Sequence, residues 1–97
     1  VSVGGLSSAP VYPRDVLKPA ILANAAALIL GHNHPSGDLT PSAADKSITT
    51  VIVHAASILG ITVHEHLIIN MEDDGYYSFA EHGYIQDAYE AVKNAAA

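Results

Sequence analysis

The stretch Ala26-Ala27-Leu28-Ile29-Leu30-Gly31-His32-Asn33-His34-Pro35 indicates the fold class of this chain. Residues 26–32 are an almost continuous apolar run of strand length, which is typical of a strand buried on both faces of an α/β sheet. The run ends directly in two histidines separated by one residue. We therefore expect a buried strand over residues 26–32 that delivers polar side chains to a loop at its carboxyl end.

The remaining segments predict helices and strands in an α/β order without internal repeats. Pro19 would kink the first helix or mark its true start. Thr40 and Pro41 are expected to cap and begin the second helix, which Gly60 would end. The predicted elements are the end of a strand over 1–6, a helix from Pro13 to about Asn24, the strand 26–32, a helix over 40–59, strands over 61–70 and 76–80, and a helix over 84–94.

Composition limits the class of protein. With 97 residues the chain is long enough for one domain only, and we assign residues 1–97 to a single α/β domain. Ten acidic and four basic residues give a net charge of -6, which disfavours direct, non-specific nucleic-acid binding. The longest unbroken apolar run is far too short to cross a bilayer, and no signal peptide is apparent, so we expect a cytoplasmic protein. Cysteine is absent, which leaves histidine and carboxylate as the strong metal ligands.

The segment from His32 to Asp45 predicts a metal site. His32 and His34 lie two residues apart on extended backbone, so both rings point to the same side about 7 Å apart. Pro35 disfavours helical dihedrals at His34 and so preserves this geometry. Asp45 and Ser42 share a face in the first turns of the following helix. Two histidines, one carboxylate and an open position suit catalytic zinc, and the Ser42 hydroxyl could donate to an oxyanion.

The other histidines need separate explanations. His64 and His66 form a second His-x-His, and strand alternation would place both on one face. Packing, or support of the first site through His66, is a better explanation than a second metal site. His54 is expected to be structural, His82 to lie in a surface turn, and Asp38 to be a loop acid.

These residues together resemble the RadC-like branch of the JAMM (MPN+, JAB-domain) metalloprotease superfamily, whose signature joins His-x-His-Pro to Ser-x-x-Asp. The resemblance covers about residues 1–83 and implies a three-layer α/β/α sandwich with a mixed sheet, of the cytidine-deaminase-like type. It also implies one zinc ion per chain, bound by His32, His34 and Asp45, a bound water as nucleophile and Ser42 as oxyanion donor. The substrate would be a peptide or protein cut at a peptide or isopeptide bond. The features that carry the match are the fixed positions His32, His34, Pro35, Ser42 and Asp45, together with Asn33, Ser36-Gly37, Tyr12-Pro13-Arg14 and Ser78-Phe79-Ala80-Glu81.

One departure from the family pattern leaves a second function open. The superfamily's general base is a glutamate N-terminal to any residue here, and no glutamate precedes Glu65. Asp15 is the only acidic residue before His32. We therefore expect the family's N-terminal strands to be missing and the open strand edges to favour a homo-oligomer. The leading hypothesis is a zinc-dependent amide hydrolase. The alternative is a non-catalytic scaffold associated with DNA repair through partners. A zinc nucleobase deaminase fits less well, because cysteine ligands and a His-x-Glu motif are absent.

Overall fold

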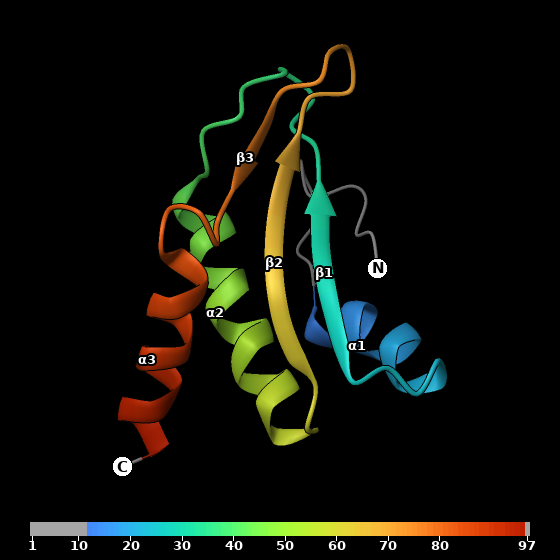
Figure 1. Ribbon diagram of the computed structural model, residues 1–97, viewed down its shortest axis with the longest axis vertical. Coiled ribbons are helices and arrows are strands. Elements are labelled where there is room, and N and C mark those ends of the chain that lie inside the picture. Colours follow the sequence, from blue (N-terminus) through green and yellow to red (C-terminus); the bar gives the residue numbers. More distant parts are fainter. Residues whose placement is uncertain (1–11, 97) are drawn as a thin grey trace.

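The computed structural model describes residues 12–96, and the strand predicted over residues 1–6 lies outside this range. All the elements predicted downstream of residue 12 are present (Figure 1). No helix within the described range is long and apolar enough to span a membrane. In chain order the elements are α1 (Pro13–Leu22), β1 (Ala27–His32), α2 (Ala43–Ile58), β2 (Thr62–Ile69), β3 (Tyr76–Ser78) and α3 (Tyr84–Ala96).

The three strands form a mixed sheet in the order β1-β2-β3. β1 and β2 are parallel, with Ala27 opposite Thr62 and His32 opposite Ile68, and α2 makes the crossover between them. β3 returns antiparallel to β2, with Leu67 opposite Ser78. Because β1 and β2 run in the same direction, their carboxyl ends lie together at one edge of the sheet, where α/β proteins commonly place ligands.

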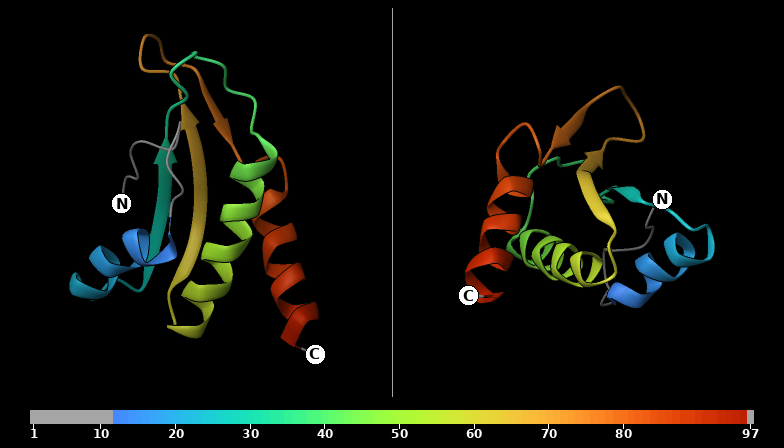
Figure 2. Two further views of the ribbon diagram at one scale, coloured as in Figure 1. Left: turned by 180° about the vertical axis from the view of Figure 1, so that it is seen from behind. Right: turned by 60° about the horizontal axis from the view of Figure 1, so that its bottom comes forward.

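The described helices cover one face of the sheet. α2 packs against β2, and α1 and α3 flank it on its two sides (Figure 2). The opposite face carries Ile29, which is 49% exposed, and Ile69. The expectation that β1 is buried on both faces is therefore wrong for residues 12–96, because α2 and α3 pack against one face of the sheet and α1 packs against α2. The core lies between the sheet and α2 and includes Leu28, Leu30, Ile52, Val53, Val63, Ile68 and Phe79.

Helix α2 begins later than the sequence suggests. Its N-cap is Ser42, not Thr40, because Ser42 and Asp45 form a reciprocal capping box. Thr40 instead donates its N–H to the Asp38 carboxylate within the preceding loop. The predicted end is confirmed: Gly60 has a φ of 75° and follows the last turn, where a left-handed glycine commonly closes a helix. Helix α1 runs through Pro19, so that proline does not mark its start.

Candidate metal centre

His32, His34 and Asp45 meet at the carboxyl end of β1. Their ligand atoms all lie within 4.8 Å of one another. His32 Nε2 lies 3.2 Å from His34 Nε2 and 3.3 Å from Asp45 Oδ1, while His34 Nε2 lies 3.0 Å from Asp45 Oδ2. His32 and Asp45 are buried, and His34 is partly exposed. We refer to these three residues as the His/Asp cluster.

The loop after β1 determines the tautomer of His34. Its Nδ1 lies 2.7 Å from the backbone carbonyl oxygen of Asp38. A carbonyl oxygen can only accept, so Nδ1 carries the proton and donates it. In the neutral ring, Nε2 then has a free lone pair directed at Asp45 and His32. Asp38 thus contributes to the site through its backbone, a role that sequence reasoning did not assign to it.

A chain of buried hydrogen bonds determines the tautomer of His32 in the same way. The Thr49 hydroxyl donates to the Asp45 carbonyl oxygen at 2.7 Å, so Thr49 Oγ1 can only accept from His66 Nδ1, also at 2.7 Å. His66 Nε2 therefore accepts from His32 Nδ1 at 2.8 Å. The proton of His32 is committed to Nδ1, and its Nε2 lone pair points into the cluster.

The three convergent groups now have no proton between them. Two imidazole lone pairs and a carboxylate at these distances repel one another unless a proton or a metal cation lies among them. Nitrogen and oxygen ligands of this kind, each oriented by an outer hydrogen bond, match the three protein ligands of a zinc site that has an open coordination position. The His/Asp cluster therefore fits a divalent metal ion.

Burial keeps the ligand His32 and its hydrogen-bond partner His66 neutral. It lowers the pKa of His66 to about 4, with the neighbouring His32 acting in the same direction. Burial also lowers the pKa of His32, and this effect exceeds the opposing attraction of Asp45. A neutral imidazole is the form that binds metal. At neutral pH His32 is therefore in the charge state that binds metal, and neutral His66 can accept the His32 Nδ1 proton.

Ser42 positions the carboxylate. Its backbone N–H donates to Asp45 Oδ2 at 2.8 Å, and its Oγ accepts the Asp45 N–H at 3.0 Å. Burial alone would favour the protonated acid, but the hydrogen bonds from Ser42, helped by His32 and His34, hold the pKa of Asp45 below its usual value. The carboxylate is thus charged, and it is oriented by the same capping box that begins α2.

A register shift in the sheet directs His66 toward the site. Leu28 lies opposite Val63 but Ile29 lies opposite Glu65, so His64 is an extra residue in β2. A bulge of this kind reverses the alternation of side chains. His64 is therefore exposed whereas His66 is 2% exposed. The expectation that the two histidines share a face is wrong for this reason.

The remaining candidate residues lie elsewhere. Asp15 is exposed in the first turn of α1, and His54 is exposed on α2. His82 donates from Nδ1 to the Ser78 carbonyl and stacks on Tyr77, which helps to close the turn before α3. Within residues 12–96, Asp45 is the only carboxylate that contacts the histidines of the His/Asp cluster.

A parallel strand pair with a helical crossover and a His/His/Asp cluster at the strand end define a small α/β domain with a candidate metal centre. Residues 1–84 match the family model of the RadC-like JAB domain, so the chain belongs to this family and the resemblance seen in the sequence is confirmed. It is 55% identical over 80 residues to the UPF0758 protein YfjY of Escherichia coli (strain K12), covering 82% of this chain and 49% of that protein. It is 49% identical over 83 residues to a UPF0758 protein of Rubrobacter xylanophilus, covering 86% of this chain and 35% of that protein. The chain thus spans half or less of the length of these relatives.

Proposed function

We propose that this domain is a zinc-dependent hydrolase that cuts an amide bond in a peptide or protein substrate. The observation that carries the proposal is the convergence of His32, His34 and Asp45 within 4.8 Å, with both imidazole protons committed elsewhere. A bound zinc ion would supply Lewis-acid chemistry, polarising a carbonyl group and making water more acidic at neutral pH. The histidines and the carboxylate would hold that ion.

The chain's own residues would orient the substrate around this centre. The His34 side chain is 20% exposed whereas that of His32 is 1% exposed, so a substrate would approach from the side of His34. Ser42 Oγ accepts from a backbone N–H, which leaves its own proton free to donate to a developing oxyanion. This is the role that we propose for Ser42, in addition to its place in the capping box.

A general base is still needed, and we propose that a carboxylate from outside residues 12–96 supplies it. Asp45 already serves as a ligand, and no other described carboxylate contacts the cluster histidines. We also propose that the domain has the three-layer α/β/α architecture that the family resemblance implies. That two copies of the chain associate through their open strand edges remains a prediction.

The same shortage of carboxylates supports a second candidate function. A domain that holds a metal without a general base would be a scaffold or interaction module, serving DNA transactions such as repair through protein partners. The net charge of -6 supports the view that any such role would be indirect.

Metal analysis and hydrolysis assays together would test the proposal. We expect about one zinc ion per chain after purification without added metal, and its loss in His34→Ala and Asp45→Ala but not in the exposed-site control His54→Ala. Hydrolysis of an isopeptide-linked or peptide substrate by the zinc-loaded protein, abolished by the same two variants, would support the enzyme. Stoichiometric zinc without hydrolysis would favour the scaffold. No zinc in the parent, even after zinc is added, would refute the hydrolase and leave the scaffold as the better explanation.

A further inference from the structure

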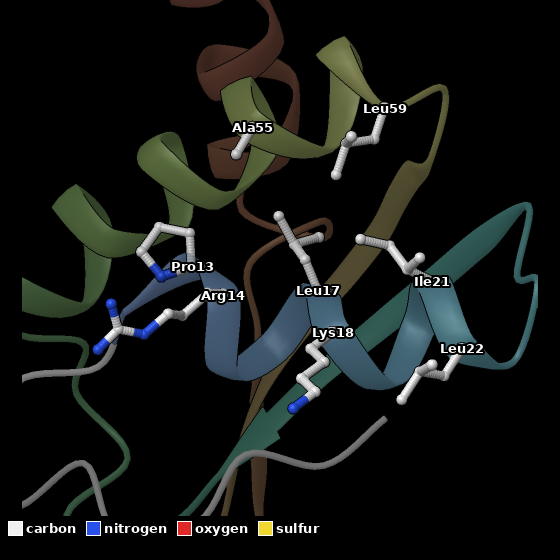
Figure 3. A pocket seen from close by; sticks show the side chains of 8 residues that line it. All are labelled: Pro13, Arg14, Leu17, Lys18, Ile21, Leu22, Ala55 and Leu59. Atoms are coloured by element: carbon white, nitrogen blue, oxygen red, sulfur yellow. The ribbon is translucent and has the colours of Figure 1, made fainter.

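A second surface feature lies at the end of the domain where the strands begin, opposite the His/Asp cluster. Helices α1 and α2 enclose an apolar groove of about 390 Å³ there (Figure 3). Leu17 and Ile21 enter it from α1, Ala55 enters it from α2, and Leu59 enters it from the C-cap of α2. The groove is separate from the metal centre, and the proposed hydrolase does not use it.

Several large apolar side chains around this groove are exposed to solvent. Ile21 is 53%, Leu22 77% and Leu59 51% exposed, and the neighbouring Ile58 is 76% exposed. Scattered exposed apolar residues are ordinary, but a contiguous group that lines a groove marks an interaction surface. Three of these exposed aliphatic side chains, Ile21, Leu22 and Leu59, line this one groove.

Charge at the rim indicates the kind of partner. Arg14, Lys18 and Leu22 follow one another at intervals of four residues, so they form one stripe of α1 beside the groove. These two cations are half of the four basic residues in a chain of net charge -6. An isologous pair of identical grooves would bring these cations close to their own copies. The rim instead complements acidic side chains on a different molecule.

The shape of the groove suits a helix. Its walls are two neighbouring helices, and residues such as Leu17 and Ile21, or Ala55 and Leu59, are spaced one turn apart on each. A third helix with apolar residues at similar spacing could pack between these ridges, as in other helix-in-groove complexes. We propose that this groove binds an acidic amphipathic helix of a protein partner, with its acids facing Arg14 and Lys18.

The test uses two designed helical peptides of about 18 residues, a length at which isolated helices begin to be stable. Both peptides carry the same leucines at positions i, i+4, i+7 and i+11; one has glutamates and the other lysines beside that face. Fluorescence anisotropy with the full chain measures both dissociation constants at low and high salt. The variants are Arg14→Glu and Lys18→Glu, each compared with the matched charge reversal Lys93→Glu on α3, and Ile21→Asp in the groove. Circular dichroism checks that each variant is folded.

We expect the glutamate peptide to bind about tenfold more tightly than the lysine peptide, with the difference reduced at high salt. Arg14→Glu and Lys18→Glu should each weaken glutamate-peptide binding roughly threefold, Lys93→Glu should not, and Ile21→Asp should abolish binding of both peptides. The proposal is overturned if neither peptide binds, if the rim reversals leave the preference unchanged, or if the chain self-associates in sedimentation and Ile21→Asp abolishes this. Preferential binding of anionic lipid vesicles that blocks the glutamate peptide would also overturn it.

Discussion

Replacing Thr49 by valine would test the supporting hydrogen bonds of the metal centre. Valine has nearly the same shape, but it removes the hydroxyl that accepts from His66 Nδ1 at 2.7 Å. Thr49 is 1% exposed, so water cannot readily replace the lost acceptor. The His66 N–H would remain buried without a partner, which costs about 1–3 kcal/mol of folding free energy.

The ring of His66 can avoid this cost only at the expense of the metal. If its proton moves to Nε2, His32 Nδ1 must become the acceptor of their 2.8 Å hydrogen bond. The His32 proton then resides on Nε2, the atom that faces the His/Asp cluster. Loss of such outer hydrogen bonds commonly weakens metal affinity about 10- to 100-fold, and we expect a loss of this size in Thr49→Val.

The control is Thr50→Val. The Thr50 hydroxyl makes the same kind of bond to the carbonyl four residues earlier, that of Lys46, at 3.2 Å, and within residues 12–96 it is not hydrogen-bonded to a histidine. Competition with a chromophoric zinc chelator would measure affinity, and urea unfolding of the metal-free protein would measure stability. Equal zinc affinities for Thr49→Val and Thr50→Val would refute the tautomer argument. A loss of stability without a loss of zinc affinity would show that Thr49 and His66 contribute to packing but not to metal binding.

Three further predictions follow from the same geometry. The pKa of His66 is about 4 in the folded protein, against 6.5 for an ordinary histidine, so the unfolded chain takes up the proton first as the pH falls. The free energy of unfolding of the metal-free protein should therefore fall by roughly 3 kcal/mol between pH 6.5 and pH 4, and the contribution of His66 should stay level above pH 6.5. Urea unfolding across this range should give a flatter profile for His66→Asn but not for His54→Asn, and an unchanged slope in His66→Asn would contradict the assignment. Ser42→Ala should lower the free energy of unfolding in urea by about 1 kcal/mol, whereas the control Ser47→Ala, at an exposed helix position, should not. Ser42→Ala should keep most of the zinc affinity, because the backbone N–H of residue 42 still donates to Asp45. Zinc at about 100 times its dissociation constant should stabilise the parent by about 2.7 kcal/mol in the same assay, reversibly with a chelator, and a similar stabilisation of Asp45→Ala would place the metal elsewhere.

The metal ligands could be predicted because they are close together in the chain. His32 ends a strand, His34 follows on extended backbone, and Asp45 occupies the third position of the next helix. Strand alternation, the effect of Pro35 and the spacing of Ser42 and Asp45 are all local rules. The same rules misplaced the start of α2 by two residues, because two candidate caps were close together and only the reciprocal bonds of Ser42 and Asp45 distinguish them.

The support of these ligands could not be predicted in the same way. Alternation along β2 places His64 and His66 on one face, and only the pairing with β1 reveals the extra residue that separates them. Register depends on how two distant segments pack, and it leaves little trace in either segment alone. Thr49 lies four residues after Asp45 on α2, a spacing visible in the sequence, but its partner His66 is 17 residues away on another element.

The metal ligands are close together in the sequence, but the residues that set the tautomer of His32 are not, and this affects whether the site can bind a metal. The segment from His32 to Asp45 supplies the atoms that could hold a metal, but neutral imidazole has two tautomers, and only one of them presents Nε2. For His32 that choice depends on β2, 34 residues further along the chain, and on the bulge that turns His66 inward. The family motif therefore identifies the ligands without ensuring that they can bind. A chain that kept the motif but lost the bulge would turn His66 away from His32, and His32 Nδ1 would lack its buried acceptor.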